Sequence, residues 1–126
     1  RDLAMLVISH DLEAVRRLAA RVAVMYLGRV VEASASDAAL ASPLMPYTQA
    51  LCAAVPTGDP AARRSRVTLR GDVPSPLSPP AGCAFHPRCP HPAKDEQCMS
   101  DRPPLVLVRV GRAVACWKVP AGPEPQ

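Results

Sequence analysis

Four of the five cysteines in this chain stand within residues 82–117, in its proline-rich second half. They are Cys83, Cys89, Cys98 and Cys116. The chain contains 16 prolines, most of them after residue 54, and residues 82–117 carry little periodic apolar pattern. A segment that buries so little apolar surface needs a covalent or metal staple to become ordered. The four thiols are therefore candidates to supply that staple.

The spacing of the cysteines leaves their ligand open. The intervals of five, eight and 17 residues match neither the two close pairs of most zinc sites nor the common ferredoxin patterns. Four soft thiolates suit either zinc or an iron–sulfur cluster. Cys83, His86 and Cys89, with His91 nearby, also allow a mixed zinc site, and unliganded thiols are a further alternative. Disulfides are disfavoured because no secretory signal is visible.

The amino-terminal end carries a different constraint. Residues 3–8 form an apolar run, which predicts a strand buried on both faces, as in parallel sheets. Parallel neighbours require crossover connections, so we expect the chain to be the carboxy-terminal part of a longer protein. His10 follows this strand and precedes a predicted helix, at the sheet edge where ligands bind in open α/β folds. A lone histidine there can equally be structural.

The remaining pattern predicts short elements. Leu12, Val15 and Leu18 recur at helical spacing. Two strands, 21–27 and 29–33, are expected around Gly28, followed by a helix over 37–41 capped by Ser36. Further expected elements are a helix over 47–54 opened by Pro46 and containing Cys52 as a core residue, a short strand over 67–69, and a hairpin over 105–110 and 113–117.

Composition excludes some classes of function. The formal net charge is +4, and 3% of residues are aromatic, so no dense basic stripe with interleaved aromatic residues supports nucleic-acid binding. The sequence has no apolar run approaching the roughly 20 residues of a membrane span. It also has no Gly-x4-Gly-Lys-Ser/Thr phosphate loop, so we predict that this polypeptide alone does not hydrolyse ATP.

Several stretches together resemble the ATP-binding subunit of ABC importers for dipeptides and oligopeptides. They are Leu6–Leu12, Ala20–Glu32, Ser42–Leu51, Gly71–Pro76, Gly82–Pro90 and Val114–Cys116. The family often has histidine where Met45 stands, and shortly before the last cysteine, where Arg112 and Ala113 stand. The resemblance implies an α/β fragment: the end of an ABC nucleotide-binding domain (1–55), a linker (56–70), a small, loop-rich α+β extension with a cysteine-ligated site (71–118) and a tail (119–126).

The resemblance also implies roles for particular residues. His10 would be the switch histidine that contacts the γ-phosphate of ATP, whose magnesium would be held mostly by residues outside this chain. Cys83, Cys89, Cys98 and Cys116 would bind a structural [4Fe-4S] cluster, with zinc as the alternative.

The expected partners are a second ATPase subunit, the membrane permease subunits and, indirectly, a solute-binding protein. The expected place is the cytoplasmic face of the bacterial inner membrane, where the complex would import peptides or related solutes such as nickel. The alternative function is a free-standing zinc or iron–sulfur module with a regulatory role.

Overall fold

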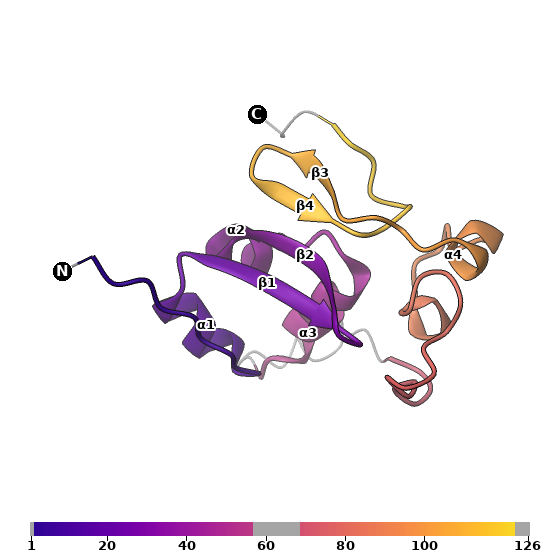
Figure 1. Cartoon of the computed structure of the whole chain (residues 1–126), viewed down its shortest axis with the longest axis horizontal. Helices are drawn as coiled ribbons and strands as arrows, with labels where there is room; N and C mark the ends of the chain where they lie inside the picture. Colours follow the sequence, from indigo (N-terminus) through magenta and orange to yellow (C-terminus); the bar gives the residue numbers. More distant parts are fainter. Residues whose placement is uncertain (1, 57–68, 123–126) are drawn as a thin grey trace.

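The structure is a computed structural model that describes residues 2–56 and 69–122. Its centre is one antiparallel sheet with strand order β1-β2-β4-β3 (Figure 1). The strands are β1 (Arg21–Tyr26), β2 (Arg29–Ala35), β3 (Val106–Arg109) and β4 (Arg112–Val114). The helices are α1 (Leu12–Leu18), α2 (Ser36–Ala41), α3 (Pro46–Ala54), the short 3-10 helix η1 (His86–Arg88) and α4 (Glu96–Ser100).

The first hairpin confirms the predicted pair of strands. Leu27 and Gly28 have φ values of 46° and 77°, so both residues of the two-residue turn are left-handed. This geometry matches the right-handed twist of the strands it joins, and glycine adopts it at no steric cost. The register runs from Arg21 opposite Ala35 to Tyr26 opposite Arg29, with an irregularity at Val24/Met25.

The three predicted helices of the first half are present. Asp11 begins α1, because its side-chain oxygen accepts hydrogen bonds from the main-chain N–H groups of Glu13 and Ala14 at 3.0 and 3.1 Å. Pro46 occupies the first turn of α3, as predicted. The prediction for Ser36 was wrong, because its hydroxyl donates to the carbonyl of Ala19 and does not cap α2. Ser36 instead joins α2 to the end of α1.

The predicted strand over residues 3–8 is absent. Residues 2–9 have no regular secondary structure, and Leu3, Leu6 and Ile8 are about nine-tenths exposed, at 86%, 90% and 92%. A strand buried on both faces needs hydrogen-bonded neighbours, and none of the described strands pairs with this run. The apolar side chains are therefore left in solvent, and every strand pairing in the described residues is antiparallel.

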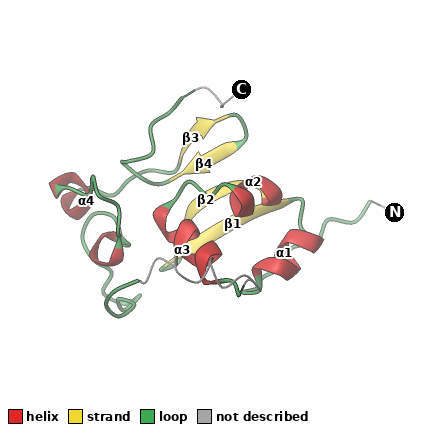
Figure 2. Ribbon diagram, turned by 180° about the vertical axis from the view of Figure 1, so that it is seen from behind, coloured by secondary structure: helices red, strands yellow, loops and turns green. Residues whose placement is uncertain are grey.

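The second hairpin completes the sheet. β3 and β4 pair with each other, and β4 also pairs with β2 through Glu32 opposite Val114 and Ala33 opposite Ala113. Strands from both ends of the sequence thus share one sheet, as Figure 2 shows from behind. The predicted linker and the strand over 67–69 lie largely outside the described residues, so the division into two domains stays a prediction.

The core lies between the sheet and the cysteine-rich segment. Its buried members are Val24, Tyr26, Val31, Met45, Phe85, Val108 and Val114. Phe85 is the only phenylalanine in the chain, and it packs against both tyrosines with ring centroids 5.4 Å from Tyr26 and 5.3 Å from Tyr47. Burying a phenylalanine side chain contributes about 2–3 kcal/mol. Phe85 therefore anchors the cysteine-rich segment to the rest of the molecule.

A buried ion pair joins β2, β4 and the loop between α2 and α3. The Glu32 side chain is fully buried, and Arg112 approaches it at 3.4 Å. The Glu32 carboxylate also accepts hydrogen bonds from the N–H groups of Leu44 (3.1 Å) and Met45 (2.9 Å). Arg112 donates in turn to the carbonyl oxygen of Ser42 at 2.5 Å. The charge on Glu32 is thus compensated on several sides, as a buried carboxylate requires.

Within residues 2–56 and 69–122, no helix is both long enough and apolar enough to cross a membrane.

Candidate functional site

The first cysteine is fixed by a close approach of two main-chain segments. Gly82 has φ 68°, and a Cβ at this position would lie 2.6 Å from the carbonyl oxygen of Cys98. The adjacent Cys83 N–H donates to that same oxygen at 2.9 Å. Because only glycine tolerates both the left-handed φ and this contact, it allows the Cys83 turn to rest directly on α4. Cys83 and Cys98, 15 positions apart, are thereby held together.

The second cysteine is placed by a run of tight turns. His86 N–H donates to the carbonyl of Cys83 at 3.0 Å, and Cys89 N–H donates to the carbonyl of His86 at 3.3 Å. Between them lies η1, in which proline occupies the first turn and needs no hydrogen-bond acceptor. Phe85 enters the core from the same loop. The loop therefore returns Cys89 toward Cys83 while its aromatic side chain is held in place.

The last two cysteines are connected through Asp95 and Lys118. Asp95 precedes α4, and its Oδ1 accepts a hydrogen bond from the Cys98 N–H at 3.3 Å. Its Oδ2 accepts one from Lys118 Nζ at 2.5 Å. The main-chain N–H of Lys118 lies 3.4 Å from Cys116 Sγ, toward which it donates. One carboxylate thus contacts both the helix that carries Cys98 and Lys118, which lies in the turn that begins at Cys116.

All four predicted ligands line one cavity. Its volume is about 20 Å³, and its walls include Cys83, Cys89, Cys98 and Cys116, together with Lys94 and Lys118. That volume is about the space of one water molecule. The structure therefore brings together four side chains that span 34 positions of sequence. The fifth cysteine, Cys52, lies on α3 and is half-buried, outside this group.

The electrostatics of the cavity oppose free thiolates. Burial raises the pKa of the Cys83, Cys89 and Cys116 thiols above the ordinary value, because desolvation disfavours the charged form. Negative charge on neighbouring thiols adds to the rise at each of the three. The positive charge of Lys94 acts in the opposite direction on the pKa of Cys89. Burial therefore favours the neutral form of the Cys83, Cys89 and Cys116 thiols.

The two histidines of the segment differ in their hydrogen bonds. His86 Nδ1 lies 2.9 Å from the carbonyl oxygen of Cys83, so Nδ1 carries the proton and Nε2 has a free lone pair. His91 Nδ1 accepts a hydrogen bond from the N–H of Ala93 at 3.1 Å, so its Nδ1 lone pair is used. Both side chains line the cavity. Of the two, His86 has the tautomer that suits a metal ligand.

The donor set fits a thiolate-bound centre by type. Four thiols converge, and soft thiolates select zinc or iron–sulfur clusters. Across the part of the chain that the structure describes, however, no three histidine, cysteine, aspartate or glutamate side chains are arranged to hold a single metal ion. In a four-iron cluster each thiolate binds a different iron, so its donors stand farther apart than those around one ion. The cavity would have to widen to accept such a cluster.

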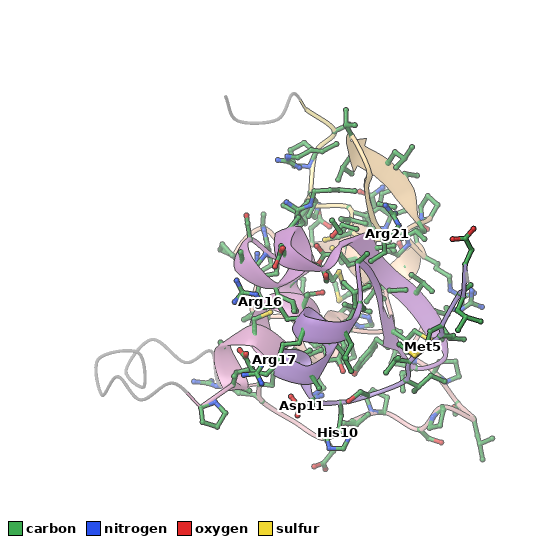
Figure 3. All side chains as sticks on the ribbon, turned by 90° about the vertical axis from the view of Figure 1, so that its left-hand side faces the viewer. Met5, His10, Asp11, Arg16, Arg17 and Arg21 are labelled. Atoms are coloured by element: carbon green, nitrogen blue, oxygen red, sulfur yellow. The ribbon has the colours of Figure 1, made fainter. Side chains whose placement is uncertain are left out.

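His10 lies away from the cysteines. It is exposed and directly precedes Asp11, at the start of α1 (Figure 3). Figure 1 shows α1 at the opposite side of the molecule from α4. The structure therefore does not bring His10 and the cysteines together, and the role of His10 stays a prediction.

Sequence reasoning missed four residues that organise the region: Gly82, Asp95, Lys118 and the buried Glu32. The sequence did offer a signal for one of them, because Asp95 stands three residues before Cys98, at the spacing of a helix cap. The contacts of the others join residues 16 to 80 positions apart. A pattern of residues that are close in the sequence cannot predict contacts between residues so far apart.

The comparisons with known proteins give the class. The family model described as "Oligopeptide/dipeptide transporter, C-terminal region" matches residues 31–98, which include three of the four clustered cysteines. This match covers more than half of the chain, and the chain belongs to that family.

Two relatives show the range of similarity. The "Probable peptide ABC transporter ATP-binding protein" of Sinorhizobium fredii is 56% identical over 114 residues, which are 90% of this chain and 32% of the relative. A dipeptide transport ATP-binding protein of Haemophilus influenzae is 43% identical over 112 residues, which are 89% of this chain and 34% of the relative. The chain thus spans about a third of the length of the curated relatives it matches.

Proposed function

We propose that this chain is the carboxy-terminal part of an ATP-binding subunit that powers the import of peptides, or of related solutes such as nickel, across the bacterial inner membrane. The family match over residues 31–98 is the observation that carries the proposal. The names of the relatives, which refer to peptide ABC transport and dipeptide transport, support it. The subunit would pair with a second ATPase subunit and dock on permease subunits at the cytoplasmic face.

In the complete subunit, His10 would contact the γ-phosphate of ATP and help to hold the attacking water. Its exposure and its position just ahead of α1 leave the imidazole accessible to a nucleotide. A neutral imidazole can donate a hydrogen bond while charge develops on the transferred phosphoryl group. Phosphoryl transfer depends mostly on such positioning and electrostatics, so one well-placed donor matters.

The ATPase proposal is tested with His10→Ala. In the full-length subunit, the variant should lower kcat by about 100-fold, the usual cost of removing one transition-state donor. The 126-residue chain alone should show no ATP turnover above background. Turnover by the isolated chain that disappears in His10→Ala would contradict the proposal that the phosphate loop must come from elsewhere.

We also propose that the four clustered cysteines bind a structural [4Fe-4S] cluster. The convergence of four thiols on one cavity supports this. Lys94 and Lys118, which line the same cavity, would offset the negative charge of a thiolate-ligated centre. When bound, the centre would link η1, α4 and the chain after β4, which is a structural role.

Metal analysis of the anaerobically purified chain tests this second proposal. We expect iron and acid-labile sulfide together with visible absorbance, and all three should be lost in Cys83→Ser or Cys116→Ser. Cys52→Ser is the matched control, because Cys52 lies outside the cavity. Stoichiometric zinc without sulfide would refute the cluster and establish the zinc alternative.

A further inference from the structure

The Asp95–Lys118 ion pair connects the start of α4, which carries Cys98, to the segment that follows Cys116. At the other end of α4, Trp117 Nε1 donates to the carbonyl oxygen of Asp101 at 2.9 Å. Asp95 binds the N–H of Cys98 through Oδ1 and the ammonium group of Lys118 through Oδ2. Lys118 N–H in turn faces Cys116 Sγ. The Lys118 side chain is only 16% exposed and lines the cysteine cavity, whereas Asp95 is 51% exposed on its outer side. The pair therefore links the start of α4 to the chain after β4, beside the cavity that Lys118 lines.

We propose that Asp95 and Lys118 are positioning residues that hold the Cys98 and Cys116 thiols at the separation needed to share one metal centre. This inference rests on the proposed metal-binding function. Residues that hydrogen-bond to metal ligands commonly act in this way, because they fix the orientation of the ligand side chains. Neither residue is a ligand in this proposal.

The charge of the pair suits that role. The hydrogen bond from Lys118 lowers the pKa of Asp95, and the hydrogen bond to Asp95 raises the pKa of Lys118. Both groups therefore remain ionised through the neutral range. Asp95 thus holds the Lys118 ammonium group in the wall of the cavity that Cys98 and Cys116 also line.

The contacts allow the ion pair to be separated from the helix cap. Asp95→Asn keeps a side-chain oxygen for the Cys98 N–H, since asparagine caps helices as well as aspartate, but it removes the charge. Lys118→Met removes the ammonium group and keeps the main-chain N–H that faces Cys116. Lys118→Arg restores a cation that can bind Asp95. Asp37→Asn is the matched control, because it breaks the exposed Arg16–Asp37 ion pair between α1 and α2.

The experiment measures how fast the loaded chain releases its metal to a chelator. The chain is loaded anaerobically with iron and sulfide, and in parallel with zinc. Asp95→Asn and Lys118→Met should each accelerate release by about tenfold or more, as changes behind metal ligands do. The double variant should match the single variants, since the pair acts as a unit. Lys118→Arg and Asp37→Asn should release metal at the wild-type rate.

Two further readouts exclude a general loss of stability. The thermal midpoint of each metal-free variant should stay near that of Asp37→Asn. In the iron-loaded chain, Lys118→Met should lower the reduction potential, because removing a nearby cation disfavours the added electron.

Outcomes against the inference are distinct from outcomes against the proposed function. Release rates in Asp95→Asn and Lys118→Met equal to that of Asp37→Asn would overturn the positioning role while leaving the metal centre intact. Binding of zinc but not of iron and sulfide would refute the cluster and still test the pair through zinc release. A wild-type chain that binds neither would overturn both proposals.

Discussion

Removing Arg112 should destabilise the fold strongly. Arg112→Ala would leave the Glu32 carboxylate, which is fully buried, without its cation. Loss of one partner of a buried ion pair costs about 3–5 kcal/mol, because a desolvated charge is stranded. The carbonyl oxygens of Ala38 and Ser42 would also lose the donor that reaches them at 3.3 and 2.5 Å, at about 1 kcal/mol each.

Two remaining contacts reduce this cost. The N–H groups of Leu44 and Met45 would still bind Glu32, so we expect a net loss of about 4 kcal/mol, below the roughly 5–7 kcal/mol to which the separate costs add. Against the 5–15 kcal/mol typical of whole domains, that is a large fraction of the stability. With a urea m-value of about 2 kcal/mol/M, the midpoint of unfolding should fall by about 2 M.

Urea unfolding followed by far-ultraviolet circular dichroism measures this shift. Arg16→Ala is the control, because its ion pair with Asp37 has side chains that are 53% and 82% exposed, and such pairs contribute about 0–1 kcal/mol. Glu32→Gln combined with Arg112→Met should cost less than Arg112→Ala alone, since no charge is stranded. An Arg112→Ala midpoint no lower than that of Arg16→Ala would refute the reasoning.

Three other predictions concern the cysteine site. Gly82→Ala should lower the free energy of unfolding by several kcal/mol, because its Cβ would meet main-chain atoms at 2.6 Å. Gly111→Ala, with φ 69° and open space around it, should cost only about 1–2 kcal/mol, and equal costs for the two variants would argue against the close approach at Gly82. Cys83→Ser and Cys116→Ser should abolish metal binding while Cys52→Ser retains it, as measured by metal analysis. The apparent metal affinity should keep rising with pH beyond the ordinary thiol pKa of about 8.5, because burial raises the thiol pKa values and metal binding displaces protons. Competition titrations from pH 6 to 9.5 measure this affinity, and an affinity that does not change with pH would contradict the prediction.

The local elements were predictable wherever short-range chemistry decides them. Two apolar runs that flank Gly28 specify the first hairpin, because only the turn and its two flanking strands are involved. Asp11 and Pro46 mark helix starts through contacts with their nearest neighbours. The four clustered cysteines line one cavity, and their role as ligands stays a prediction.

The failures have a common physical cause. Residues 3–8 have the composition of a buried strand, but a strand is stabilised by the neighbours that bind its main chain, and no described segment pairs with it. Ser36 is a residue type that often caps helices, yet its hydroxyl donates a hydrogen bond to the carbonyl of Ala19 instead. In both cases the local preference of the residues is clear from the sequence, but the group that they bind in the folded chain is not.

The sequence by itself determined the hairpins, the starts of α1 and α3, the family and the set of candidate thiols, because each depends on residue types at short or characteristic spacings. Only the tertiary structure decided that β2 pairs with β4 and that Gly82 rests on α4. It alone showed that Glu32 meets Arg112 and that Asp95 meets Lys118. These contacts join residues distant in the chain, and their strength depends on burial and geometry, which arise only when the whole chain packs.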